Sequence, residues 1–228
     1  MSELNADFSK RVVMRTAQMD WQASPSAGVW RKRLELAGDV EKGRVTSVVR
    51  YDAGSAFAPH DHPEGEEFLV LDGVFSDEHG DYPAGSYLLN PRGFRHAPRS
   101  APGCTIFVKL RQYAGPDRPH LNIDTAAADW QPGTAPGHAV LPLYEGGGNY
   151  PESIRLVRFD PGFEAPDHTH PGGEEIYVVE GTLEDEDGRY AAGDWLRLPP
   201  GSRHRPRSPD GCLIYVKSGH LPPGSPTR

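Results

Sequence analysis

The chain has 228 residues and a formal net charge of −8 at pH 7, with 26 glycines and 23 prolines. The acidic balance and the scatter of Lys and Arg argue against a nucleic-acid-binding protein, and no apolar run approaches the roughly 20 residues of a membrane span. The first 15 residues lack the apolar core and cleavage site of a secretory signal, so we expect a cytoplasmic protein of one large domain or two small ones.

Short strand-like runs separated by turn residues follow one another along the chain. An apolar run at residues 68–71 precedes a tight turn at 79–80, and a further strand begins after Gly85 and turns at residues 91–93. The second half shows the same order. Its strand-like run, tight turn, strand start and Pro-Pro-Gly turn lie at residues 176–179, 187–188, 193 and 199–201. Many short strands at regular spacing predict an antiparallel sandwich or barrel.

The second half of the chain is a repeat of the first. Residues 60–67 (His-Asp-His-Pro-Glu-Gly-Glu-Glu) reappear as residues 168–175 (His-Thr-His-Pro-Gly-Gly-Glu-Glu), and the offset of 108 holds without a gap from residue 49 to residue 109. Such a register over sixty positions indicates an internal duplication. We therefore expect an N-terminal segment at 1–19, a first domain at 20–115, a linker at 116–128, a second domain at 129–220 and a tail at 221–228.

Six of the ten histidines fall into this repeat. Side chains two apart on a strand point to the same face, so His60 and His62 project together. His96 lies thirty residues after Glu66 and follows a Pro-x-Gly turn, where a neighbouring strand would return it to the same place. Three imidazoles and one carboxylate are typical ligands of a first-row divalent metal. The predicted ligands are His60, His62, Glu66 and His96 in the first half, and His168, His170, Glu174 and His204 in the second.

Two alternatives stay open for these residues. Glu67 or Glu175 would be the carboxylate ligand in place of Glu66 or Glu174 if a β-bulge shifted the register. The histidines would also fit as polar residues satisfied inside a core, but a complete ligand set that occurs twice favours the metal. The remaining histidines, His79, His120, His138 and His220, are expected in solvent, and Cys104 and Cys212 are expected as small buried apolar residues, with redox activity as the alternative.

These motifs resemble the two signatures of the cupin superfamily. In the first copy they are Gly54, His60-x-His62, Glu66 and Gly73, followed by Gly85, Pro91-x-Gly93 and His96; in the second they are Gly162, His168, His170, Glu174, Gly181, Gly193, Pro199, Gly201 and His204. The superfamily often ends its second motif with asparagine, where this chain has Ser100 and Ser208. The departure leaves the ligand set intact. Within the superfamily, residues 74–85 and the text His-Pro-Gly-Gly-Glu-Glu resemble the cupin part of ChrR, an anti-ECF-sigma factor.

The resemblance implies an all-β protein with two tandem cupin domains, each a double-stranded β-helix or jelly roll. It implies one divalent transition metal per domain, with zinc, Fe(II), manganese and nickel as the candidates. ChrR binds its sigma factor through an N-terminal helical zinc domain. This chain has no cysteine before Cys104 and only a short N-terminal segment, so sigma-factor binding is not expected to carry over. A small-molecule ligand and a homo-oligomer are both compatible with the sequence.

Three functions remain from the sequence. The first is a ChrR-like metal-binding protein that responds to a ligand or an oxidant without catalysis. The second is a non-haem dioxygenase that cleaves a diketone or an aromatic ketone, since the same branch includes such enzymes. The third is a cupin isomerase, hydrolase or decarboxylase. Both copies keep every predicted ligand, so the sequence does not nominate one catalytic half.

Overall fold

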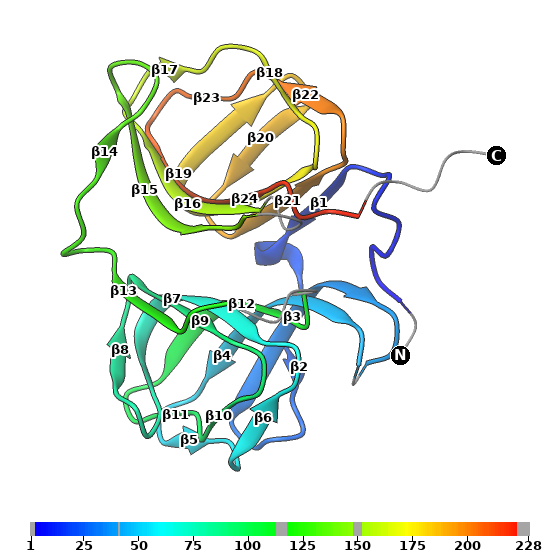
Figure 1. Ribbon diagram of the computed structural model, residues 1–228, viewed down its shortest axis with the longest axis vertical. Coiled ribbons are helices and arrows are strands. Elements are labelled where there is room, and N and C mark those ends of the chain that lie inside the picture. The colour runs from blue at the N-terminus through cyan, green and yellow to red at the C-terminus, as the bar shows by residue number, and fades with distance from the viewer. Residues whose placement is uncertain (1–2, 41, 113–117, 148–151, 223–228) are drawn as a thin grey trace. The chain divides into compact units, whose positions relative to one another are not determined.

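The computed structural model describes residues 3–40, 42–112, 118–147 and 152–222 (Figure 1). In these ranges the regular structure is β apart from one short 3-10 helix, η1 (Thr16–Gln18), which confirms the predicted all-β class. The described residues include no helix with the length and hydropathy needed to cross a membrane. The chain divides into two units, the first made of residues 1–6 and 19–128 and the second of residues 7–18 and 129–228.

The first unit is a barrel-like arrangement of one large sheet and one short ribbon. The described large sheet follows the order β13-β9-β7-β12-β4-β3-β2, with β5, β8 and β11 attached to it, and β6 pairs with β10. All these pairs are antiparallel. The strands are β2 (Gln22–Ala23), β3 (Val29–Ala37), β4 (Arg44–Tyr51), β5 (Ser55–Ala56), β6 (His60–His62), β7 (Glu66–Ser76), β8 (Asp81–Pro83), β9 (Ser86–Asn90), β10 (Phe94–His96), β11 (Arg99–Ser100), β12 (Cys104–Leu110) and β13 (Leu121–Asp124).

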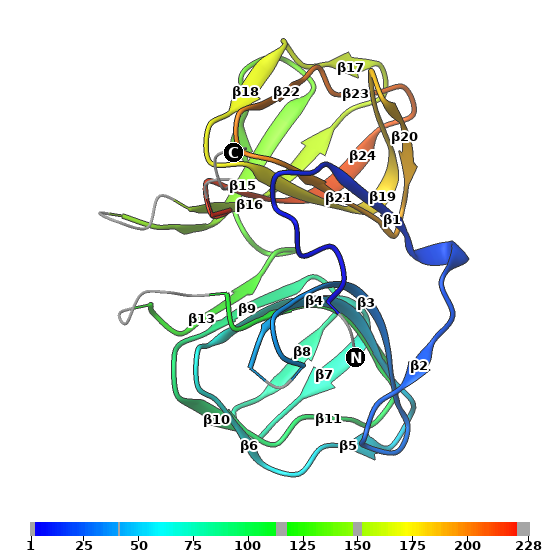
Figure 2. The same ribbon diagram turned by 90° about the vertical axis from the view of Figure 1, so that its right-hand side faces the viewer.

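The second unit repeats this topology. Its described large sheet follows the order β1-β21-β19-β24-β16-β15-β14, with β17, β20 and β23 attached, and β18 pairs with β22. Figure 2 shows β18 and β22 side by side in this unit. The strands are β1 (Val12–Arg15), β14 (Gln131–Pro132), β15 (His138–Glu145), β16 (Ser153–Phe159), β17 (Phe163–Glu164), β18 (His168–His170), β19 (Glu174–Asp185), β20 (Gly188–Ala191), β21 (Asp194–Leu198), β22 (Ser202–His204), β23 (Arg207–Ser208) and β24 (Cys212–Ser218).

Each unit encloses its own apolar core between the strands. The alternation of β-strands sends every second side chain inward, so the long strand β7 contributes Phe68 and Val70 to the first core and β19 contributes Ile176 and Val178 to the second. Cys104 and Cys212 lie in these cores as free, buried thiols, as the sequence predicted.

A β-bulge divides the longest strand of each unit. The register of β7 against β12 shifts between Val70 and Asp72, and β19 shifts between Val178 and Glu180 against β24. The shift reverses which side chains point inward beyond it. Just after the bulge, Gly73 has a φ of 73°, and a Cβ atom there would lie 2.0 Å from the carbonyl oxygen of Gly103. Only glycine therefore fits at this position.

Two strands pair outside the domain boundaries that the sequence predicted. Strand β1, within the expected N-terminal segment 1–19, pairs with β21 of the second unit. Strand β13, within the expected linker 116–128, pairs with β9 of the first unit. Both are four-residue edge strands of alternating, incomplete burial, and four residues are at the lower limit of length at which a strand pattern can be identified from sequence. Residues 116–117 of that linker and 223–228 of the predicted tail lie outside the described residues.

The two exchanged strands are equivalent to each other. The sequence Thr-Ala-x-x-Asp-Trp-Gln follows β1 at residues 16–22 and recurs after β13 at residues 125–131. The Thr125 hydroxyl donates a hydrogen bond of 2.6 Å to the Gly85 carbonyl. Thr16 lies against Gly193, the counterpart of Gly85 in the second unit. The first strand of each sequence repeat therefore completes the sheet that is built mainly from the other repeat.

Candidate metal centre

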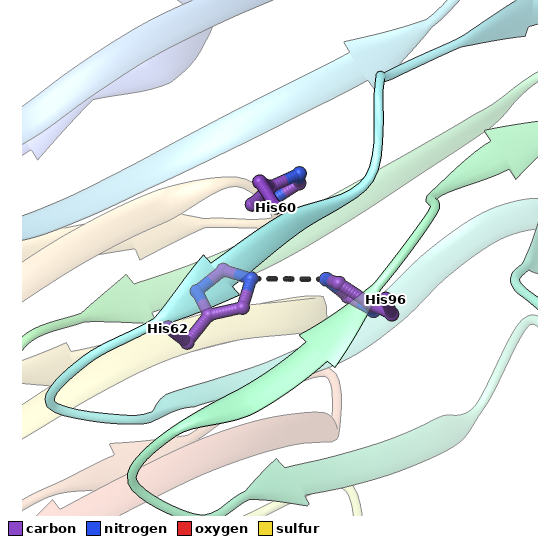
Figure 3. Close-up of side chains that lie close together, drawn as sticks. All are labelled: His60, His62 and His96. Atoms are coloured by element: carbon purple, nitrogen blue, oxygen red, sulfur yellow. Dashed lines mark hydrogen bonds between the residues drawn. The ribbon is translucent and has the colours of Figure 1, made fainter.

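A short two-stranded ribbon in each unit brings the predicted histidines together. In the first unit His60 of β6 lies directly opposite His96 of β10, and His62 lies two residues along the same strand (Figure 3). In the second unit β18 and β22 pair in the same register, with His168 opposite His204. The nitrogen atoms of each histidine group lie within 4.8 Å of one another.

In the first unit, Glu66 completes the cluster. Nε2 of His62 and Nε2 of His96 are 2.9 Å apart, and Oε2 of Glu66 lies 3.6 Å from each of them. Asn90 donates a hydrogen bond of 3.0 Å to the same oxygen of Glu66. His62, Glu66 and His96 are buried, whereas His60 is half-buried at the edge of the cluster.

The second unit repeats this arrangement around Glu174. Its carboxylate lies 3.3 Å from Nδ1 of His170 and 3.6 Å from Nε2 of His204. His170, Glu174 and His204 are buried, and His168 is exposed at the rim. Both units therefore bring together all four residues that the sequence selected.

The neighbouring glutamates point to the other face of the sheet. Glu67 is buried and accepts a hydrogen bond of 3.4 Å from the Tyr87 hydroxyl. Glu175 lies 3.0 Å from Nε2 of His220. The bulge that would have exchanged the two carboxylates lies beyond Glu66, at residues 70–72, so it does not bring Glu67 to the histidines. The geometry thus favours Glu66 and Glu174.

Backbone carbonyls fix the tautomer of the outer histidines. Nδ1 of His60 lies 3.0 Å from the Ala58 carbonyl oxygen, and Nδ1 of His168 lies 2.9 Å from that of Pro166. A carbonyl oxygen only accepts hydrogen bonds, so the proton of each neutral ring is on Nδ1. The lone pair on Nε2 remains available for a ligand.

A carboxylate that the sequence analysis missed lies beside the last histidine of each set. Oδ2 of Asp77 lies 3.2 Å from Nδ1 of His96, and Oδ2 of Asp185 lies 3.5 Å from Nδ1 of His204. The Tyr82 hydroxyl donates to Asp77 (3.2 Å), as Tyr190 does to Asp185 (2.7 Å). Carboxylates of this kind orient metal-binding imidazoles and increase their basicity. The signal was present, because both Asp and Tyr recur at the offset of 108.

Burial and neighbouring charges lower the pKa of some histidines in the clusters and raise that of another. Burial, together with the charges of His204, His168 and Arg155, lowers the pKa of His170 to about 3. Burial also lowers the pKa of His62. For His96, burial acts in the same direction, but the hydrogen bond to Asp77 and the charge of Glu66 outweigh it and raise the pKa. Neutral imidazoles are the form that binds metal ions.

The donor set fits a first-row divalent ion. Donors bound about 2.1 Å from one ion lie about 3.0–3.4 Å apart. The donors of His62, His96 and Glu66 lie 2.9–3.6 Å apart, and the three histidine donors of each unit lie within 4.8 Å of one another. Among the described residues, Nε2 of His170 and Nε2 of His204 are buried without a hydrogen-bond partner. A buried polar atom without a partner is costly, and a bound cation would satisfy both.

The second unit also holds a cavity of about 610 Å³ beside its cluster. His168, Glu174 and His204 line it, together with Arg155 of β16 and His138 of β15. His138 had been predicted in solvent, but its ring packs against Phe159. The prediction that His220 lies in solvent is also wrong, because its side chain is only 3% exposed and lies beside Glu175. His79 and His120 are exposed, as predicted.

The fold and the paired clusters define a protein of two tandem cupin domains. The ChrR cupin-like domain family matches the chain twice, over residues 9–114 and 119–222. The chain belongs to this family. No curated protein matches it in sequence.

Solved structures with the same fold are distant in sequence. A candidate dioxygenase from Nostoc punctiforme is 17% identical with a TM-score of 0.75, and the match covers 96% of this chain and 85% of that one. The Escherichia coli pirin YhhW in complex with nickel(II) is 12% identical with a TM-score of 0.70, covering 94% and 100%. A variant of the oxalate decarboxylase OxdC from Bacillus subtilis is 12% identical with a TM-score of 0.66, covering 91% and 76%.

Proposed function

We propose that this chain is a ChrR-like metal-binding protein in which each unit holds one divalent transition metal. The ligands are His60, His62, Glu66 and His96 in the first unit, and His168, His170, Glu174 and His204 in the second. The observation that carries the proposal is that the full donor set converges twice, each time with an aspartate beside the last histidine. Imidazole and carboxylate donors suit iron, manganese, nickel and zinc.

The metal determines what the centre does. Zinc prefers four ligands, so three histidines and one glutamate would complete its shell as a structural site. Six-coordinate iron(II), manganese(II) or nickel(II) would keep positions for a small molecule. A bound ion of this kind would supply Lewis acidity, while the histidines and the glutamate would orient its remaining ligand positions.

A non-haem dioxygenase is the second candidate. The cavity beside His168, Glu174 and His204 favours it, because it leaves room for a substrate next to the donor set. The candidate dioxygenase among the solved relatives also supports it, although at 17% identity that likeness concerns only the fold.

Metal analysis of protein purified without chelators tests the proposal. We expect two ions per chain, and one ion per chain in His62→Ala and in His170→Ala. A wild-type chain with no bound metal after reconstitution would refute it. Oxygen uptake by the iron(II)-loaded protein with a diketone would support the dioxygenase, whereas tightly bound zinc without uptake would eliminate it.

A further inference from the structure

The cavity beside the second cluster has the size of a small-molecule site. Its volume of about 610 Å³ lies within the range of 300–1,000 Å³ that is usual for ligand pockets. Apolar side chains of the barrel make most of its wall: Val140, Val157, Phe159, Ile176, Ile214 and Val216. A ligand bound there would have an apolar body and would reach the donor set at one end.

Two positions of the cavity wall, Ala165 and Ile176, carry bulkier side chains in the first unit. The repeat places Phe57 at the position of Ala165 and Phe68 at that of Ile176. The Phe57 ring lies 5.8 Å from the ring of His60 and 5.7 Å from that of Tyr51, centroid to centroid. Phenylalanine therefore stands beside the outer histidine of the first cluster, where alanine leaves room beside His168 in the second.

Arg155 supplies the arginine side chain that lines the cavity. The repeat has a serine, Ser47, at the equivalent position of the first unit. Arg155 lies opposite Val216 across the sheet, and Ser47 lies opposite the equivalent Val108 in the first unit. The Arg155 side chain is 35% exposed, and its guanidinium lies 4.0 Å from the Glu174 carboxylate. Its hydrogen bonds to the hydroxyls of Ser153 and Ser218 are long, at 3.4 Å each. A guanidinium has five N–H donors, so this one retains capacity for an anion.

The first unit has an arginine at another position of its barrel. Arg31 of β3 lies opposite Val49, where the second unit has Val140 opposite Val157. Its guanidinium donates a short hydrogen bond of 2.5 Å to the Ser24 hydroxyl. Its Nε is buried without a hydrogen-bond partner among the described residues. Arg31 is the counterpart of Val140, so it provides the matched control for Arg155 in the first unit.

We propose that the two centres are not equivalent: the second binds a small organic anion with an apolar body, whose carboxylate or enolate pairs with Arg155, whereas Phe57 closes the first centre to such ligands. The inference rests on the proposed metal sites and assigns them separate tasks. The first centre stabilises its barrel, and the second carries the ligand response or the chemistry.

Calorimetric titration of the full chain loaded with two cobalt(II) ions tests the assignment. The probes are acetate, butyrate and benzoate, with benzamide as a neutral analogue of benzoate. We expect one benzoate per chain and at least tenfold weaker binding of benzamide. Arg155→Met should weaken benzoate binding at least tenfold, Arg155→Lys should restore part of it, and Arg31→Met should leave it unchanged.

Ala165→Phe gives an independent arm, since it carries the residue of the first unit into the second. We expect this variant to keep two cobalt ions and a native circular dichroism spectrum but to lose the benzoate site. Two benzoates per chain, equal affinity in Arg155→Met, or no saturable binding of any carboxylate to the two-cobalt protein would overturn the inference. Fewer than two cobalt ions in the wild-type chain would instead count against the proposed metal sites.

Discussion

Oδ2 of Asp77 lies 3.2 Å from Nδ1 of His96, the ring nitrogen that does not face Glu66. The aspartate thereby fixes the proton on Nδ1 and leaves Nε2 for the metal. We expect Asp77→Asn to weaken metal binding at the first centre roughly 10–100-fold, measured by competition with a chromophoric chelator. Asp81→Asn is the matched control, because Asp81 is exposed on β8. Unchanged affinity in Asp77→Asn would show that the aspartate only packs the core.

The choice between adjacent glutamates can be tested by stoichiometry. Glu66→Gln removes the carboxylate that lies 3.6 Å from both His62 and His96, so we expect it to lower the metal content from two ions to one. Glu67→Gln changes a buried carboxylate on the opposite face, and it should keep two ions while it lowers the unfolding temperature. The reverse pattern of metal loss would move the ligand to Glu67.

The low pKa of His170 predicts acid sensitivity of the metal-free protein. An unfolded chain takes up a proton on this histidine near pH 6.5, whereas the folded chain does so only at about pH 3. Between these values the unfolded state binds more protons, so the free energy of unfolding falls as the pH falls. In His170→Gln the slope should be shallower by up to about 1.4 kcal/mol per pH unit.

Urea unfolding of chelator-treated protein from pH 7 to pH 4 measures this slope. The exposed His79 provides the control variant, His79→Gln. Parallel curves for wild type and His170→Gln would mean that His170 is protonated in the folded protein at neutral or mildly acidic pH.

The two cysteines should be inert in the native state. Burial raises the pKa of the Cys104 thiol to about 11 and also raises that of Cys212. The reactive thiolate is therefore scarce at neutral pH. We expect neither thiol to react with a disulfide reagent until denaturant is added, when both should react. Rapid native labelling would revive the redox alternative and identify a thiol as the oxidant sensor.

Strand β1 should be required by the second unit. A chain without residues 1–18 loses the strand that pairs with β21, and also Arg11, whose guanidinium lies 2.7 Å from Asp185. We expect a lower unfolding temperature and self-association through the uncovered edge of β21, measured by calorimetry and light scattering. Removal of residues 223–228 is the control. A monomer of unchanged stability would show that β1 contributes little.

Much of the fold and of the donor set was accessible from sequence because the duplication doubles each signal. The spacing of His60, His62, Glu66 and His96 recurs without a gap, and alternation along a strand suffices to bring the first two together. The sequence analysis missed Asp77 because this residue lies eleven positions after Glu66. Simple alternation along a strand places residues at an odd separation on opposite faces. The bulge at residues 70–72 reverses that parity and turns Asp77 toward His96.

The cavity could not be predicted from the sequence for a different reason. The cavity depends on positions where the two copies have side chains of different volume, such as Ala165 and Phe57. A search for repeats finds only the positions at which the two copies agree. His138 was set aside because it has no counterpart, yet it lines the cavity. Positions at which a duplicated protein differs are therefore informative about the separate tasks of its halves.

The exchange of β1 and β13 sets an order for folding on the ribosome. The described strands of the first unit have all been synthesised by residue 124, so this barrel can close early. Strand β1 emerges before the strands of the first unit, but its partner β21 follows about 180 residues later. At ~5–20 residues per second, β1 therefore remains without its partner strand for on the order of ten to forty seconds. Completion of the second barrel is then the late step of biosynthesis. Until that step, β1 is the segment that a chaperone would have to shield.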